Sequence, residues 1–171
     1  PDVKRHQIAT AEVPDARQRR AAIESEPLPT NMGAFIQASA QAGGDALLWN
    51  FFESGETITY AELGRKVRSL AAGLQRLGVE KGTHVGVMLP NIAAMPLTWL
   101  AIATLGAVMI PVNPSYTERE LAYVVGDGEA RFVVTAADAV DRFAAAISTE
   151  DLPIAADHLI VQGGGARKAP H

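Results

Sequence analysis

The stretch that decides the fold is residues 82–117, GTHVGVMLPNIAAMPLTWLAIATLGAVMIPVNPSYT, which contains no Asp, Glu, Lys or Arg. Residues 83–89 form a β-branched, apolar run between a glycine and a proline, which is typical of a strand. Residues 91–105 are long enough for a helix, and residues 107–112 form a second apolar run. Strand, helix and strand within about thirty residues predict a βαβ unit of a parallel sheet. The absence of charge indicates that both strands and much of the helix are buried.

A membrane span is an alternative interpretation of the same stretch. Residues 92–112 form a charge-free run long enough to cross a bilayer. Pro96, Gly106 and Pro111 interrupt the run, and no cluster of Lys or Arg flanks it closely. The buried βαβ unit is therefore the preferred interpretation.

A ligand site is the other alternative, because Asn91, Trp99 and Asn113 could contact a ligand at the carboxyl ends of the strands. We prefer a structural role for each residue. Asn91 is expected to cap the helix, Trp99 to pack in the core, and Asn113 to form a turn with Pro114.

The composition is that of an ordinary globular protein of one domain. The chain has 171 residues, of which 48% are hydrophobic and 20% charged, and its net charge is −4. No basic face is evident in the sequence, so a nucleic-acid partner is not expected. The absence of cysteine excludes disulfides and thiolate metal sites. The first residues lack the apolar core of a signal peptide, so we expect a cytoplasmic protein.

The amino-terminal part is predicted to be mixed in structure. Residues 1–30 form a polar extension with a short helix over 16–24, whose arginines are expected in solvent. Asn31 is expected to cap a helix over 32–42 that turns Phe35, Ile36 and Ser39 to one side. A β-hairpin then follows, with strands over 46–52 and 56–60 around Glu53-Ser54-Gly55.

The hairpin leads into a long amphipathic helix. Thr59 and Glu62 have the spacing of a capping box, and Gly78 is expected to end the helix. Gly64 and Gly73 lie inside it, and close packing against a neighbouring element is the expected reason for both. The side chains predicted to face inward are Leu63, Val67, Leu70, Ala71, Leu74 and Leu77.

Beyond the opening stretch, helices and strands continue to alternate. A second capping box, Thr117 with Glu120, begins a helix whose apolar side is Leu121, Val124 and Val125. The later elements are predicted as a strand over 131–135, a helix over 138–148 and a strand over 158–162. The last helix is expected to turn Val140, Phe143, Ala144 and Ile147 inward.

The predicted fold class is α/β. It has three layers, with a mostly parallel sheet between helices on both faces, preceded by a β-hairpin and a short N-terminal helical segment. Residues 31–162 form the predicted α/β subdomain, and residues 163–171 form a flexible tail.

The sequence offers no signature of a catalytic or binding site. It contains no GxxxxGK[ST], GxSxG, HExxH or GxGxxG motif. His84 and His158 are interpreted as structural residues, and Glu62 and Glu120 as capping residues. The nearest phosphate-loop candidate, GGGARK at residues 163–168, opens no helix and is interpreted as tail. No catalytic, cofactor-binding or metal-binding residue is assigned.

A resemblance to a known family lies in the order and spacing of several segments. These are ITYAEL at residues 58–63, GVEKG at 78–82, VGVMLPN at 85–91, LAIATLGAVMIPVNP at 100–114 and TERELAY at 117–123. Together they resemble the opening of an AMP-forming acyl-CoA synthetase of the adenylate-forming superfamily. The resemblance covers roughly residues 30–162, and the form PVNP at 111–114 is more similar to the acyl-CoA ligases than to peptide-synthetase domains.

This resemblance implies a two-step ligase that uses ATP, Mg²⁺ and CoA. A carboxylate, either a fatty acid or an aromatic acid, first forms an acyl-adenylate, and a thiol then displaces AMP. The catalytic motifs of the family lie beyond these residues, so the chain is expected to be an inactive N-terminal fragment that binds no nucleotide tightly. Self-association through exposed apolar surface is a possible consequence. The alternative is a stand-alone α/β binding or interaction module on the same scaffold.

Overall fold

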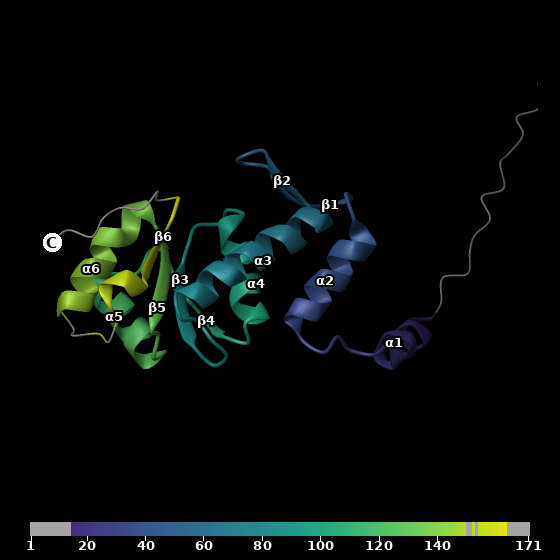
Figure 1. Cartoon of the computed structure of the whole chain (residues 1–171), viewed down its shortest axis with the longest axis horizontal. Coiled ribbons are helices and arrows are strands. Elements are labelled where there is room, and N and C mark those ends of the chain that lie inside the picture. Colours follow the sequence, from purple (N-terminus) through teal and green to yellow (C-terminus); the bar gives the residue numbers. More distant parts are fainter. Residues whose placement is uncertain (1–14, 150–151, 153, 164–171) are drawn as a thin grey trace, which may run out of the picture.

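A computed structural model of the chain describes residues 15–149, 152 and 154–163 (Figure 1). The polypeptide alternates between helices and strands throughout this part. In chain order the elements are α1 (Ala16–Ser25), α2 (Met32–Gly43), β1 (Leu47–Phe51), β2 (Glu56–Thr59), α3 (Tyr60–Arg76), β3 (His84–Met88), α4 (Ala94–Thr104), β4 (Val108–Pro111), α5 (Glu118–Asp127), β5 (Phe132–Ala136), the 3₁₀ turn η1 (Ala137–Ala139), α6 (Val140–Thr149), the 3₁₀ turn η2 (Ala156–His158) and β6 (Leu159–Gln162).

Four strands form one parallel sheet in the order β4-β3-β5-β6. The predicted βαβ unit is confirmed, because β3 and β4 pair in parallel on either side of α4. The predicted hairpin is also confirmed, with β1 and β2 pairing antiparallel and Gly55 at φ +71° in the turn. β2 belongs to this separate two-stranded sheet and takes no part in the parallel one.

Helices cover both faces of the parallel sheet, as predicted for the fold class. Figure 1 shows α3 and α4 on one side of the strands and α5 and α6 on the other. Side chains alternate between the two faces along β5: Phe132 and Val134 pack in the core with α2, α3 and α4, whereas Val133 packs in the core with α5 and α6. The sheet thus separates two hydrophobic cores.

The outer strand β4 is less buried than its apolar sequence predicts. Val108 is 41% exposed, because among the strands that the structure describes β4 pairs with β3 alone. The Val108 N–H donates to the Thr83 carbonyl just before β3 at 2.9 Å, and the Val112 N–H donates to the Val87 carbonyl of β3 at 3.0 Å. In a strand, the backbone N–H groups of successive residues point to opposite edges. The N–H at position 111 would therefore point to the free edge of β4, but Pro111 has no N–H. The free edge of β4 is therefore poor at pairing with another strand.

Helix α4 begins at Ala94 and not directly after Asn91, and this start explains its proline. Ala93 holds the N-cap position, so the prediction that Asn91 caps the helix is wrong. Pro96 then lies in the first turn, where no intrahelical donor is needed. Trp99 is 49% exposed, so the prediction that it packs in the core is also wrong. None of the helices in the described ranges is long and apolar enough to cross a membrane.

The other helices keep their predicted positions but differ in a few inward residues. Phe35 is 51% exposed on α2, and only Ile36 is buried there. Leu70 and Leu77 lie at the margin of the buried face of α3, at 39% and 47% exposure. On α6, Ala146 is buried and Ala144 is exposed.

The two helix-interior glycines of α3 have different surroundings. A Cβ on Gly64 would lie 2.7 Å from the Cβ of Ala40 on α2, so close packing explains this glycine as predicted. A Cβ on Gly73 would meet only the Arg76 guanidinium, at 4.0 Å. The prediction of close packing is therefore wrong for Gly73, which costs roughly 1 kcal/mol of helix propensity relative to alanine.

Candidate functional site

The carboxyl edge of the parallel sheet is the place where this architecture binds ligands. From β3 the chain crosses to β4 on one side, and from β5 it crosses to β6 on the other side. The adjacent ends of β3 and β5 therefore form the switch point of the sheet. Leu89 after β3 is buried, and Ala137 after β5 is exposed. Neither residue carries a group for acid–base or nucleophilic chemistry.

A hollow of about 640 Å³ lies beside this edge, between the loop after β4 and helix α6. The loop turns tightly, because Asn113 Oδ1 accepts a hydrogen bond from the Ser115 N–H at 2.9 Å and the Tyr116 N–H donates to the Asn113 carbonyl at 3.1 Å. The predicted turn at Asn113 is therefore confirmed. The lining residues are Ser115, Tyr116, Thr117, Glu118, Arg119, Arg142 and Ala146.

Arg142 on α6 fixes the position of this loop. Its Nη1 donates to the carbonyl of Pro114 at 2.7 Å and to the carbonyl of Tyr116 at 3.1 Å. These bonds join segments 26 and 28 residues apart in the chain. Sequence reasoning missed Arg142, because no local pattern reveals which carbonyl groups a helix residue will meet after folding.

The far end of the loop is held by the capping box of α5. The Thr117 N–H donates to Glu120 Oε2 at 2.8 Å, and the Thr117 hydroxyl donates to the same oxygen at 2.9 Å. The backbone bond, and after it the hydroxyl bond, lowers the pKa of the Glu120 carboxyl from its ordinary value of 4.5. Glu120 is thus occupied as a capping residue, as predicted.

The chemistry available at this hollow is limited to binding. Arg119 and Arg142 place two guanidinium groups on its lining, and Glu118 adds a carboxylate. Guanidinium groups suit anionic or carbonyl oxygens. The lining offers hydroxyl groups but no histidine or cysteine, and hence no nucleophile with an adjacent imidazole base.

The other residues considered from the sequence do not assemble a site. Trp99 lies on the outer side of α4, and Asn91 makes no side-chain hydrogen bond in the described part of the chain. His84 Nδ1 lies 2.7 Å from the Gly128 carbonyl, and His158 Nδ1 lies 3.0 Å from the Arg131 carbonyl. Both histidines join neighbouring segments at the amino edge of the sheet, in agreement with structural roles.

Metal and phosphate sites are not found among the residues that the structure describes. No group of three His, Asp or Glu side chains there could hold a metal ion. The GGGARK segment predicted as tail lies outside the described residues after Gly163. One buried polar atom, Thr135 Oγ1 on β5, lacks a hydrogen-bond partner within the described structure.

Comparison with known proteins gives a consistent result. The family described as "AMP-binding enzyme" matches residues 35–170. The chain is 34% identical over 117 residues to 4-coumarate–CoA ligase 4 of Arabidopsis thaliana, which covers 67% of this chain and 20% of that protein. It is 38% identical over 85 residues to a long-chain-fatty-acid–CoA ligase of Escherichia coli, which covers 49% of this chain and 15% of that protein. The chain therefore spans about a fifth or less of these relatives.

Solved structures agree with this result. A long-chain-fatty-acid–CoA ligase of Archaeoglobus fulgidus superposes with a TM-score of 0.71 at 26% identity, over 82% of this chain and 29% of that one. The N-terminal domain of FACL13 from Mycobacterium tuberculosis also superposes with a TM-score of 0.71, at 22% identity, over 77% of this chain and 34% of that one. The second likeness concerns the fold alone.

Proposed function

The chain belongs to the AMP-binding enzyme family, and on that premise we propose that it is the N-terminal portion of an ATP-dependent, AMP-forming acyl-CoA ligase. The observation that carries the proposal is the family match over residues 35–170, together with relatives named as coumarate and long-chain fatty acid ligases. We place the subdomain at residues 31–162, after an extension over 1–30. The substrate class is a small-molecule carboxylate, either aromatic or aliphatic.

The proposed reaction of the complete protein has two steps. A carboxylate oxygen attacks the α-phosphorus of ATP, which forms the acyl-adenylate and releases pyrophosphate. The sulfur of CoA then attacks the acyl carbon, which forms the thioester and releases AMP. Mg²⁺ would neutralise charge on the phosphates, but the described residues contain no cluster that fits it. The described residues therefore contribute no step of their own through the metal.

The proposed contribution of this portion is a rigid wall beside the reacting groups. The sheet is buried between two helical layers, and the loop after β4 is fixed at both ends and by Arg142. Such a loop can present its backbone and its hollow to a ligand without reorganising. The hollow is lined by no histidine or cysteine, and its one hydroxyl–carboxylate pair, Thr117 with Glu120, serves as a helix cap, so we expect the 171-residue chain alone to be inactive.

Carboxylate-dependent ATP–pyrophosphate exchange tests this proposal. The assay compares the 171-residue chain with the product of the complete reading frame, using coumarate and a long-chain fatty acid as carboxylates. We expect exchange from the complete product and none from the 171-residue chain. Robust exchange by the short chain would contradict its role as scaffold. A folded complete product that activates neither class of carboxylate would contradict the assignment as a ligase of these acids.

A further inference from the structure

Arg142 joins two segments of the chain that leave the sheet on opposite sides of β3. Both β4 and β5 pair with β3, and the loop after β4 and helix α6 follow the carboxyl ends of these two neighbours. From α6, Arg142 Nη1 donates to the carbonyls of Pro114 and Tyr116 in that loop, at 2.7 and 3.1 Å. These bonds therefore connect the two sides of the switch point, where open α/β sheets bind their ligands.

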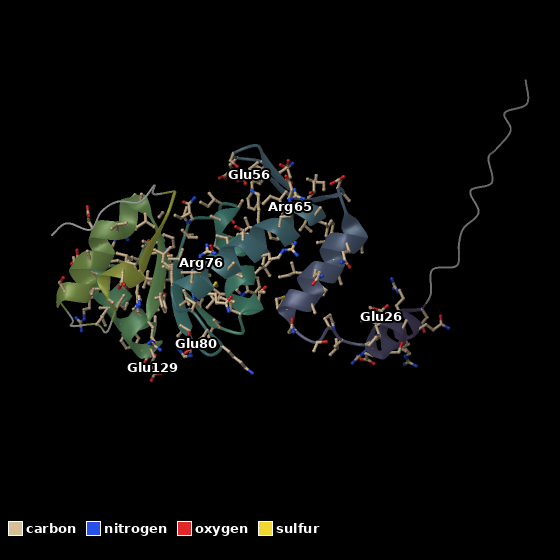
Figure 2. The ribbon with its side chains drawn as sticks, viewed as in Figure 1. Glu26, Glu56, Arg65, Arg76, Glu80 and Glu129 are labelled. Atoms are coloured by element: carbon tan, nitrogen blue, oxygen red, sulfur yellow. The ribbon has the colours of Figure 1, made fainter. Side chains whose placement is uncertain are left out.

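The guanidinium group of Arg142 is held in place but is not neutralised. Its Nη1 is occupied by the two carbonyls, and a guanidinium has further N–H groups on Nε and Nη2. Among the residues that the structure describes, Arg142 forms no salt bridge. The Glu120 carboxylate at the end of the same loop is bound to Thr117, and Figure 2 shows Glu129 beyond the far end of α5. The half-buried side chain of Arg142 therefore brings a positive charge to the hollow.

The lining of the hollow carries more positive than negative charge. Arg119 and Arg142 contribute two guanidinium groups, against the single carboxylate of Glu118. The Ser115 hydroxyl adds a further hydrogen-bond donor. Guanidinium and hydroxyl donors suit phosphate oxygens. Of the reactants in the proposed ligase reaction, ATP and CoA carry such groups, and they fit this lining better than the apolar body of a fatty acid does.

The loss of Arg142 would act on the loop and leave its supports at both ends in place. The Pro114 and Tyr116 carbonyls would lose their donor, whereas the turn at Asn113 and the capping box of α5 would remain. The fold should therefore survive, but the loop between these supports would be less ordered. A ligand that binds beside a less ordered loop must pay the entropy of ordering it, so its affinity falls.

We propose that Arg142 is a positioning residue of the complete ligase, which holds the loop after β4 across the switch point and thereby sets the affinity for a phosphate-bearing reactant, ATP or CoA. The identity of the reactants rests on the proposed function. Arg142 acts through the loop, so its effect depends on the two bonds to the loop carbonyls and not on charge alone.

Two variants of the complete reading-frame product separate the geometry of Arg142 from its charge. Arg142→Lys keeps the charge, but its ammonium nitrogen falls one bond short of the Nη1 position. Arg142→Gln removes the charge as well. The matched control, Arg131→Gln, removes an exposed arginine at the amino edge of the sheet. Isothermal titration calorimetry gives the Kd of Mg–ATP and of CoA, steady-state thioester formation gives kcat and the KM of each reactant, and amide hydrogen exchange at residues 115–117 reports the order of the loop.

We expect both Arg142 variants to raise the Kd and the KM of Mg–ATP or of CoA by about tenfold, to leave kcat within about twofold of the parent, and to speed exchange at residues 115–117. The Arg131→Gln control should change none of these values. Which of the two Kd values rises identifies the reactant beside the loop. Full affinity in Arg142→Lys together with faster exchange would show that charge alone matters, and this would overturn the positioning role.

Other outcomes are equally decisive. Unchanged Kd values for both Mg–ATP and CoA in Arg142→Gln, or a parent that binds neither, would overturn the inference. A rise confined to the KM of the carboxylate would overturn the assignment to a phosphate-bearing reactant. A parent that forms no thioester would contradict the proposed function, whereas the Kd and exchange measurements would still decide the role of Arg142. Circular dichroism verifies that each variant is folded, and Arg142→Lys alone provides the test if Arg142→Gln fails to fold.

Discussion

Two large aromatic residues of helices, Trp99 and Phe143, differ strongly in burial. Phe143 on α6 is 1% exposed, whereas Trp99 on α4 is 49% exposed. Helix α6 has a clear apolar side, so its phenylalanine could be assigned to the core from periodicity. Helix α4 is apolar on all sides, and periodicity therefore gives no indication of which side chains face outward.

This difference predicts unequal effects of the same truncation. Phe143→Ala is expected to lower the free energy of unfolding by about 3–5 kcal/mol, because it leaves a cavity in a closed core. Trp99→Ala is expected to lower it by only about 1–2 kcal/mol, because half of the side chain already contacts water. Urea unfolding of both variants and the parent chain measures these values. Equal losses would show that Trp99 belongs to the core after all.

At the scale of elements, alanine at each of the two glycines inside α3 is expected to change stability in opposite directions. Gly64→Ala is expected to destabilise the chain by about 1–3 kcal/mol, because its Cβ would overlap with Ala40. Gly73→Ala is expected to stabilise it by about 0.5–1 kcal/mol, because it improves helix propensity and its Cβ would meet only the flexible Arg76 guanidinium, at 4.0 Å. Thermal unfolding followed by circular dichroism compares the two directly. A loss of stability with Gly73→Ala would place an unseen neighbour within the fold.

The two capping boxes give the helices α3 and α5 a pH-dependent start. The Thr59 N–H donates to Glu62 Oε2 at 2.9 Å and, as the largest cause, lowers the pKa of that carboxyl. The Thr117 N–H acts in the same way on Glu120. A lowered pKa in the folded state means that the stabilisation is present above the ordinary carboxyl pKa and is lost as pH falls through the folded value.

We therefore expect the chain to lose stability as the pH falls below about 4.5. The double variant Glu62→Gln with Glu120→Gln should lose less stability over this interval than the parent, because it lacks both titrating caps. Unfolding midpoints measured between neutral and acidic pH test this difference. The matched control is Glu53→Gln with Glu129→Gln, which removes two carboxyl groups from exposed positions. An equally small loss of stability at acidic pH in this control would show that net charge, and not the caps, causes the difference.

At the scale of the whole molecule, the distribution of burial predicts a gradient of local stability. The central strands β3 and β5 contain side chains that are fully buried, such as Val85 and Val133 at 0% exposure. Helix α1 has no buried residue. Amide hydrogen exchange should be slowest in β3 and β5 and fastest in α1, because local opening costs least where few contacts are lost. Protection of α1 equal to that of β3 would show that α1 docks on the body in solution.

How much the sequence predicts depends on whether a feature is local. The βαβ unit, the hairpin and both capping boxes were predictable, because each is written in residues close along the chain. The exposure of Trp99, the edge position of β4 and the role of Arg142 were not, because each depends on which distant segments become neighbours. The helix start at Ala94 also differs, since Asn91 suits a cap chemically but the chain does not turn helical there.

The order of the strands in the sheet also bears on how the chain folds during its synthesis. A ribosome makes the chain from its amino end, so β3 is the first strand of the parallel sheet to emerge. In the finished sheet, β3 lies between β4 and β5. The next strand, β4, covers one side of β3 and ends with Pro111, whose missing N–H interrupts the outer edge. A nascent chain that has emerged as far as Pro111 therefore already has one sheet edge that pairs poorly with neighbouring copies on the same polysome. Further growth of the sheet is then directed to the side of β3 where β5 arrives.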